Sequence, residues 1–187
     1  MTELKLLQQK MKEIEDLSVQ GDYEAAVILL ESLLAEYPFV TRMLIRKGEL
    51  IQLLPEASER GELSDAQEAL ELAVEIDPQS VEAILELAYF HSAVLDQEME
   101  AAKLFDRAIQ LCFEILEEAY LGKIQNLINR GRSIEARQWI QGARKLFPTS
   151  VDMKQFEIHW RPARLKTNAS RIRDEKGKIF IAPESNV

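Results

Sequence analysis

The sequence predicts an all-α protein, an α-solenoid of about four helix-turn-helix repeats that ends in a capping helix. Three observations support this fold class. Leu, Ala, Glu, Ile and Gln, most of which favour helices, dominate the 187 residues. Gly and Pro are scarce, at 7 and 6 residues, which disfavours a turn-rich β-sandwich. A pattern of Gly, Ala and Pro recurs along the chain, which is typical of repeat architectures.

The repeat becomes visible when Gly21, Gly61 and Gly131 are aligned. At fixed offsets after each glycine follow an alanine, a large aliphatic residue, a Leu or Ala, and a proline. These residues are Ala26, Ala66 and Ala136; Leu30, Leu70 and Ile140; Leu33, Ala73 and Ala143; and Pro38, Pro78 and Pro148. The glycines are 40 and 70 residues apart, and because 70 is twice 35 they predict a hidden repeat that starts at Asp96. Phe113 stands where this repeat would have its proline.

Each repeat is interpreted as two helices joined by a turn. Glycine permits the positive φ of the turn, the small alanine lets the neighbouring helix approach closely, and proline ends the second helix. The helices that precede the turns are expected over residues 4–19, 41–54, 81–95 and 114–129. Ser64 with Gln67 is interpreted as a capping box that opens the second helix of repeat two. Residues 55–60 lengthen the turn before it.

This pattern resembles the tetratricopeptide repeat (TPR). The run from Gly21 through Tyr23 and Ala26 to Pro38 matches the second helix of that motif, and residues 84–88 match the first. The resemblance covers about residues 4–148. It implies TPR-like repeats in which the first helix of each pair lines a concave face that binds partner proteins. Lys123 departs from the motif because it stands at a position that is usually Leu.

The resemblance also implies which side chains face a ligand, namely the second, fifth, ninth and twelfth residues of each first helix. Carried over to this sequence they are Arg42, Ile45, Glu49, Gln52, Glu82, Leu85, Tyr89, Ser92, Glu118, Leu121, Gln125 and Ile128. The apolar members would form a strip rimmed by carboxylates and amides. The alternative for each residue is that it packs against a neighbouring helix. Some TPR proteins hold an acidic peptide terminus with Lys and Asn on this face, but neither residue type stands at the matching positions of this sequence, so that role is rejected.

Charge is unevenly distributed along the chain. Residues 1–160 hold 16 Lys+Arg and 29 Asp+Glu, whereas residues 161–187 hold 7 and 3. An acidic body disfavours nucleic acid as a partner and favours a protein, in particular a basic one. The alternative explanation is that the net charge serves only solubility.

No arrangement of residues indicates an enzyme. The single cysteine, Cys112, excludes a disulfide framework and a Cys-based zinc site, and we interpret it as a small buried apolar residue. Of the two histidines, His91 is interpreted as a satisfied histidine on a packed face, and His159 has no nearby Ser or Cys. We therefore expect no catalytic residue, no metal and no cofactor.

The sequence thus predicts a repeat domain with its terminal cap over residues 1–160 and a basic tail over 161–187 that is flexible, docked on a surface or folded as a small hairpin. Our leading hypothesis is a non-enzymatic TPR-type adaptor. Its specific version is an acidic inhibitor, immunity-like or chaperone-like binder of a basic partner. The alternative is an assembly protein that self-associates through the end of the stack. The first residues have no apolar signal core and no run approaches 18 apolar residues, so we expect a cytoplasmic protein without a membrane-spanning helix.

Overall fold

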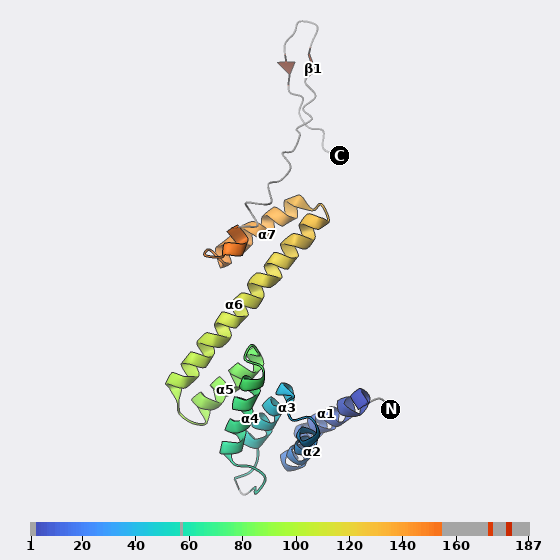
Figure 1. Ribbon diagram of the computed structural model, residues 1–187, viewed down its shortest axis with the longest axis vertical. Helices are drawn as coiled ribbons and strands as arrows, with labels where there is room; N and C mark the ends of the chain where they lie inside the picture. Colours follow the sequence, from blue (N-terminus) through green and yellow to red (C-terminus); the bar gives the residue numbers. More distant parts are fainter. Residues whose placement is uncertain (1–2, 57, 155–171, 174–178, 181–187) are drawn as a thin grey trace. The chain divides into compact units, whose positions relative to one another are not determined.

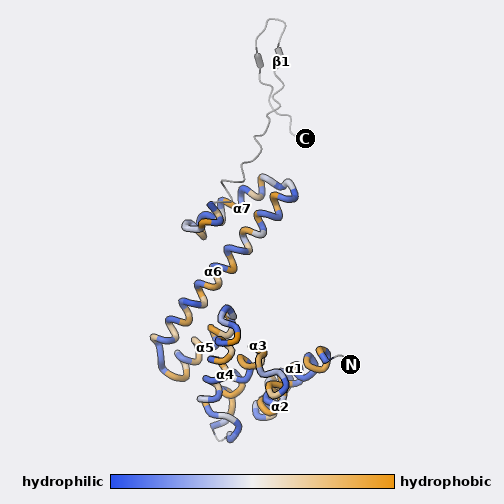
Figure 2. Tube along the Cα trace, viewed as in Figure 1, coloured by the Kyte–Doolittle hydropathy of each residue, from blue (hydrophilic) through white to orange (hydrophobic). Residues whose placement is uncertain are grey.

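The computed structural model describes residues 3–56, 58–154, 172–173 and 179–180 (Figure 1). The helices are α1 (Glu3–Gln20), α2 (Tyr23–Glu36), α3 (Thr41–Gln52), α4 (Leu63–Ile76), α5 (Val81–Ala93), α6 (Glu98–Asn129) and α7 (Ser133–Leu146). The all-α fold class, with helices that follow one another in helix-turn-helix pairs, is confirmed. Figure 2 shows apolar and polar residues alternating along the helices, as amphipathic helices require.

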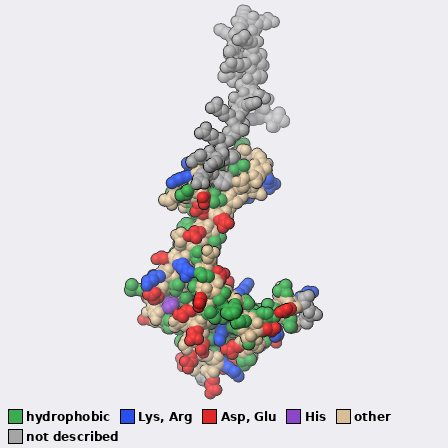
Figure 3. Space-filling model, viewed as in Figure 1, with side chains coloured by type: hydrophobic (Ala, Val, Ile, Leu, Met, Phe, Trp, Pro, Cys, Tyr) green, Lys and Arg blue, Asp and Glu red, His purple; other side chains and the backbone are tan. Residues whose placement is uncertain are grey.

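The chain divides into two compact units, which we call the N-terminal unit (Met1–Leu116) and the C-terminal unit (Glu117–Val187). The N-terminal unit holds 9 Lys+Arg and 24 Asp+Glu, a net charge of −15. The C-terminal unit holds 14 and 8, a net charge of +6. Acidic side chains, red in Figure 3, are spread over the part of the molecule that contains α1–α5. The net charge therefore changes from negative to positive at the boundary between the units, before residue 161, where the basic tail was expected to begin.

Local signals set several helix ends. Asp22 caps α2 by accepting a hydrogen bond from the backbone N–H of Ala25 at 3.2 Å. Ser80 caps α5 in the same way. Gly21 and Gly131 have φ angles of 81° and 72°, so the turns before α2 and α7 need the left-handed conformation that glycine adopts without strain. The repeat pattern thus marks these two turns correctly.

The start of α4 differs from the expected one. The capping box is formed by Glu62 and Asp65: the backbone N–H of Glu62 donates to Asp65 Oδ2 at 2.8 Å, and the Glu62 side chain accepts from the backbone N–H of Asp65. The interpretation of Ser64 with Gln67 as the box is therefore wrong. Since α4 begins at Leu63, Ser64 already lies inside the first turn, where its side chain is exposed.

This capping register predicts a pair of unequal effects. Asp65→Ala should lower the free energy of unfolding by about 1 kcal/mol, because it leaves a helix-terminal N–H without its acceptor. Ser64→Ala should be nearly neutral, since its hydroxyl caps nothing. Urea denaturation followed by circular dichroism measures both. A larger loss for Ser64→Ala than for Asp65→Ala would contradict the observed box.

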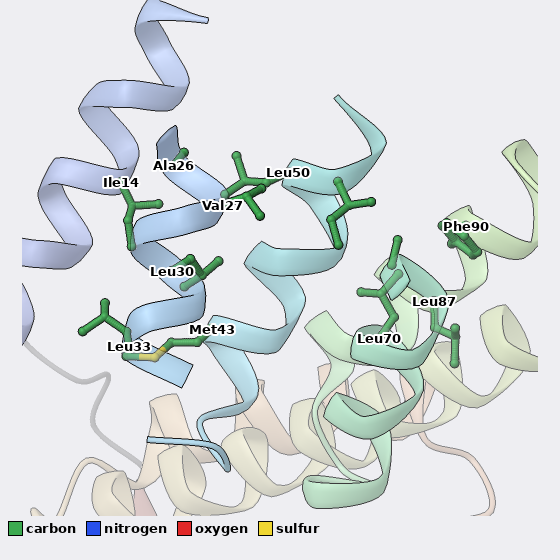
Figure 4. Packing of buried hydrophobic residues seen from close by; sticks show 12 residues of the cluster. Ile14, Ala26, Val27, Leu30, Leu33, Met43, Leu50, Leu70, Leu87 and Phe90 are labelled. Atoms are coloured by element: carbon green, nitrogen blue, oxygen red, sulfur yellow. The ribbon is translucent and has the colours of Figure 1, made fainter. Parts of the chain in front are cut away.

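Most of the N-terminal unit is held by one apolar core, to which each helix from α1 to α5 contributes buried residues. Figure 4 shows Val27 of α2 beside Leu50 of α3, and Leu33 of α2 next to Met43 of α3. The three alanines at the fixed offset, Ala26, Ala66 and Ala136, are fully buried in their respective units. Their burial agrees with the prediction that a small residue at this offset lets the neighbouring helix approach closely.

Helix α6 corrects the predicted repeat boundary. It runs without interruption for 32 residues through Phe113, so the separate helix expected over 114–129 is wrong. The physical reason is that nothing between 98 and 129 terminates a helix: the range contains no proline, and its single glycine, Gly122, lies within the helix. The expected start of this repeat is correct, because Asp96 has a φ of 55° and so replaces the missing glycine.

The C-terminal unit has its own core, formed by residues of α6, α7 and the segment after α7. Residues 151–154 are helical, and Met153 is buried against this core. They form the beginning of the expected capping helix, and its remainder to residue 160 lies outside the described residues. In the basic tail, β1 (Ile172–Arg173) pairs antiparallel with β2 (Ile179–Phe180), which is the hairpin arrangement among the expected alternatives. The rest of the tail also lies outside the described residues.

Candidate functional site

A groove with a volume of about 480 Å³ lies on the first helices of the pairs in the N-terminal unit. Its volume falls within the range of ligand-binding clefts. It is lined by Met11, Lys12, Ile14, Glu15, Arg42, Ile45, Arg46, Glu49 and Glu82. These residues come from α1, α3 and α5, the helices to which the TPR resemblance assigns the concave face.

The floor of the groove is apolar. Ile14 of α1 and Ile45 of α3 are only 1% and 2% exposed, and Met11 of α1 is half-buried. Both isoleucines also pack into the core. The groove thus offers an apolar floor against which a side chain of a ligand could pack.

Arg46 ties α1 to α3 at one wall. Its guanidinium donates to Glu49 at 2.7 Å, to Glu15 at 3.0 Å and to the hydroxyl of Ser18 at 2.8 Å. Because Arg46 is half-buried and bonded on both helices, it serves to join them. Its positive charge is compensated within the wall by the two carboxylates.

Three other charged side chains of the groove have no partner of opposite charge in the described part of the chain, so they could pair with a ligand. Within the described part of the chain, Lys12, Arg42 and Glu82 form no ion pair. Arg42 and Glu82 are exposed at the rim. Unpaired charges at the rim of an apolar floor can select a partner of complementary charge.

Glu86 adds a perturbed carboxylate on α5, one turn after Glu82. Partial burial raises the pKa of Glu86 above its usual value, and the neighbouring charges of Glu49 and Glu82 raise it further. The fold thus disfavours the ionised form of Glu86. A cation placed among these three carboxylates would oppose this effect.

Glu86→Gln should raise the melting temperature at pH 7. A carboxyl whose pKa is raised by folding destabilises the native state when it is ionised, and this destabilisation disappears as the pH falls below the pKa of the unfolded chain. The advantage of the variant should therefore vanish below about pH 4. Glu68→Gln on α4, which changes the charge equally at an exposed residue, is the control and should leave the melting temperature unchanged. Equal gains for both variants would contradict a special environment at Glu86.

The structure brings four of the twelve expected ligand-facing residues into the groove: Arg42, Ile45, Glu49 and Glu82. Gln52 instead donates to the backbone carbonyl of Gly48 at 2.9 Å. Leu85 is half-buried on α5, and Ser92 at the end of α5 donates to Glu98.

Tyr89 lies outside the groove lining but on the same face of α5 as Glu82, because the two residues are seven positions apart. It is 56% exposed. Its ring meets the ring of Phe105 edge-on, with centroids 5.2 Å apart. This contact holds an exposed aromatic ring in place farther along the helix.

The last four expected residues belong to the C-terminal unit. Leu121 and Ile128 pack against its core, so the alternative of helix packing applies to them. Gln125 donates to Asn129 at 2.7 Å, and Glu118 is exposed.

The contributions of α1 and of Arg46 to the groove were not expected from the sequence. The signal for α1 was present: the ninth and twelfth residues of the range 4–19 are Lys12 and Glu15, which both line the groove. Arg46 stands at none of the carried-over positions. Only its bonds to Glu15 and Ser18 on another helix show its role.

Two residues weighed for chemistry have ordinary surroundings. His91 is half-buried, and its Nδ1 shares a hydrogen bond of 2.8 Å with Oε1 of Gln97. Cys112 is exposed, which corrects its interpretation as a buried residue. The reason is that α6 continues through this position instead of turning back. In the described ranges, no three metal-binding side chains are grouped to hold an ion, and no helix is long and apolar enough to cross a membrane.

Comparisons with known proteins give three findings. No protein-family model matches the chain. An uncharacterized 18.1 kDa protein in the carS 3' region of Myxococcus xanthus is 32% identical over 101 residues, which are 54% of this chain and 57% of the relative. The matched part thus spans little more than half of that protein. Among solved structures, the crystal structure of MamA protein aligns with a TM-score of 0.47 at 21% identity, covering 79% of this chain and 76% of that chain.

Proposed function

We propose that the chain is a non-enzymatic protein-interaction module of the TPR type that holds a segment of a partner protein in the groove on α1, α3 and α5. The observation that carries this proposal is the groove itself, which combines a buried apolar floor with unpaired charges at its rim. A preformed groove of this kind lowers the entropy cost of holding an extended or helical segment.

The partner segment carries a basic side chain at the α5 end of the groove, beside Glu82, whereas Lys12 and Arg42, which also form no ion pair within the described residues, suit acidic side chains of the same segment. The groove belongs to a unit with a net charge of −15, and Glu82 has no ion pair within the described residues. A Lys or Arg of the partner beside Glu82 and Glu86 would relieve the mutual repulsion of these carboxylates. The acidic surface around them would also speed the encounter with such a partner. An inhibitor or chaperone of a basic protein would act in this way.

Affinity capture with a matched pair of variants tests the proposal. Glu82→Arg reverses a charge at the rim of the groove, whereas Glu75→Arg makes the same change on an exposed position of α4, outside the groove. We expect the wild-type chain and Glu75→Arg to retain the same proteins from a cell extract. Glu82→Arg should retain less of them at low salt, and mass spectrometry quantifies the difference.

Which captured proteins each variant loses decides whether the groove holds the partner. Proteins retained equally by all three chains bind elsewhere, and their retention would count against the groove. Equal loss with both variants would show that only the net charge of the unit matters.

A further inference from the structure

A shallow pocket of about 240 Å³ lies between the end of α6 and α7, within the C-terminal unit. It is lined by Tyr120 of α6 and by Gln138, Trp139 and Gly142 of α7, and we use the name α7 pocket for these four residues. A Cβ on Gly142 would meet nothing within 4 Å, so the glycine leaves open space on this face of α7. Clefts that hold whole small molecules measure roughly 300–1,000 Å³, so the α7 pocket suits a single side chain.

The aromatic walls of the α7 pocket are held from behind. The ring of Tyr120 meets the ring of Trp139 with centroids 5.2 Å apart and the ring of Phe147 with centroids 5.7 Å apart. Tyr120 and Phe147 both belong to the core of the C-terminal unit. Trp139 remains 39% exposed. A partner that covers this ordered ring loses little side-chain entropy, and tryptophan is enriched among binding hot spots.

Two lysines place positive charge at the α7 pocket. The ammonium group of Lys123 lies over the ring of Trp139, 5.6 Å from its centroid. Lys145 is exposed and follows Gly142 by three residues, so it lies on the same face of α7. Neither lysine forms an ion pair within the described residues. Ammonium groups and the indole N–H can only donate hydrogen bonds, so their complement is a group that accepts them.

The nearby carboxylates are already engaged. Glu135 is the single acidic residue of α7, and the guanidinium of Arg132 donates to both of its oxygens, at 2.5 and 2.7 Å. Glu117, three residues before Tyr120 on α6, accepts a hydrogen bond from the hydroxyl of Ser150, in the segment after α7. The charge that remains along α7 and at Lys123 is therefore positive.

We propose that the α7 pocket binds an acidic segment of a partner protein, which places one apolar side chain over Gly142 and carboxylates beside Lys123 and Lys145. The aromatic rings and the open space receive the apolar side chain, and the lysines select the carboxylates. A single-stranded nucleic acid needs a free ring face for stacking, but Lys123 covers one face of Trp139 and Tyr120 also contacts this ring. The proposal is independent of the groove on α1, α3 and α5, because the two sites share no residue.

Fluorescence anisotropy with the full chain tests which chemistry binds. The probe is a fluorescein-labelled Glu-Asp-Leu-Asp-Glu peptide. We expect it to bind at least about tenfold more tightly than Glu-Asp-Ala-Asp-Glu, which lacks the large apolar side chain, and than Gln-Asn-Leu-Asn-Gln, which lacks the carboxylates. Labelled oligo(dT) is the nucleic-acid probe. Tighter binding of oligo(dT) than of the acidic peptide, or no binding of this peptide at about 1 mM, would overturn the proposal.

A matched pair of glycine variants tests where the probe binds. Gly142→Met fills the open space of the α7 pocket and should weaken binding of the acidic peptide at least about tenfold in Kd. Gly122→Met makes the same substitution on α6, where a Cβ also meets nothing within 4 Å but the position lies outside the pocket, and should bind as the wild-type chain does. Both variants replace a helical glycine by a better helix former, so neither should lower the melting temperature. Equal affinities of the two variants would refute the site.

Discussion

Gly48→Ala is expected to destabilise the N-terminal unit by about 1–3 kcal/mol. A Cβ at this position would lie 2.6 Å from Cγ and 2.9 Å from Cδ2 of Leu70, closer than real Cβ atoms come to other atoms. Leu70 is completely buried, so it has no space into which to retreat. Helix propensity by itself favours alanine over glycine by about 1 kcal/mol. We expect the free-energy cost of the clash between the new Cβ on α3 and Leu70 on α4 to be larger than this gain in helix propensity.

Gly142→Ala supplies the control for this effect. Gly142 also lies inside a helix, α7, but a Cβ there would meet nothing within 4 Å. The same substitution should therefore stabilise the protein by about 0.5–1 kcal/mol. Urea denaturation of both variants measures the opposite signs. Combining Gly48→Ala with Leu70→Ala should cost less than the two losses added together, because the smaller side chain removes the clash. A stabilising effect of Gly48→Ala would contradict the close approach of α3 and α4.

Tyr89→Ala should weaken binding of the partner in the groove by about 2 kcal/mol, close to 30-fold in Kd. Tyr89 shares its helix face with Glu82 and Glu86 and stands exposed beyond them. The edge contact with Phe105 holds its ring, so little side-chain entropy is lost when a partner covers it. Tyrosine also offers a large apolar face with a polar tip, a combination that is frequent at binding hot spots. Surface plasmon resonance should show the loss mainly as faster dissociation.

Two further variants separate the roles of ring, hydroxyl and position. Tyr89→Phe keeps the ring and should retain most of the affinity. Phe39→Ala removes an aromatic ring that is 73% exposed in the turn between α2 and α3, away from the groove lining, and should leave binding unchanged. Glu82→Arg should mainly slow association, and added salt should reduce the difference. Normal binding by Tyr89→Ala together with a loss for Phe39→Ala would move the partner to another surface.

Local residue patterns were sufficient for most helix ends. Gly21 with Asp22 marks the start of α2, and Gly131 marks the turn before α7, because positive φ and N-capping depend on a few consecutive residues. The capping box of α4 shows how two local signals compete. Glu62 with Asp65 and Ser64 with Gln67 have the same spacing, and the observed helix start selects the first pair.

The continuity of α6 could not be predicted from the repeat pattern. Periodicity placed a boundary at Phe113, but a helix ends only where a residue breaks it or where its apolar face loses its neighbours. The range 98–129 contains no proline, so local propensity favoured one helix and the periodic pattern favoured two. The observed helix follows the local propensity.

The composition of the groove shows where sequence reasoning ends. The TPR resemblance implied that Arg42, Ile45 and Glu49 face a ligand, and the helical period places residues at this spacing on one face of α3. Only the tertiary structure shows which charged side chains of the groove are ion-paired and which are not. Arg46 is compensated by Glu15, a residue 31 positions away on α1, whereas Glu82 is left unpaired within the described chain. Ion pairs between helices depend on how the helices stack, and the separation of residues along the chain does not contain that distance.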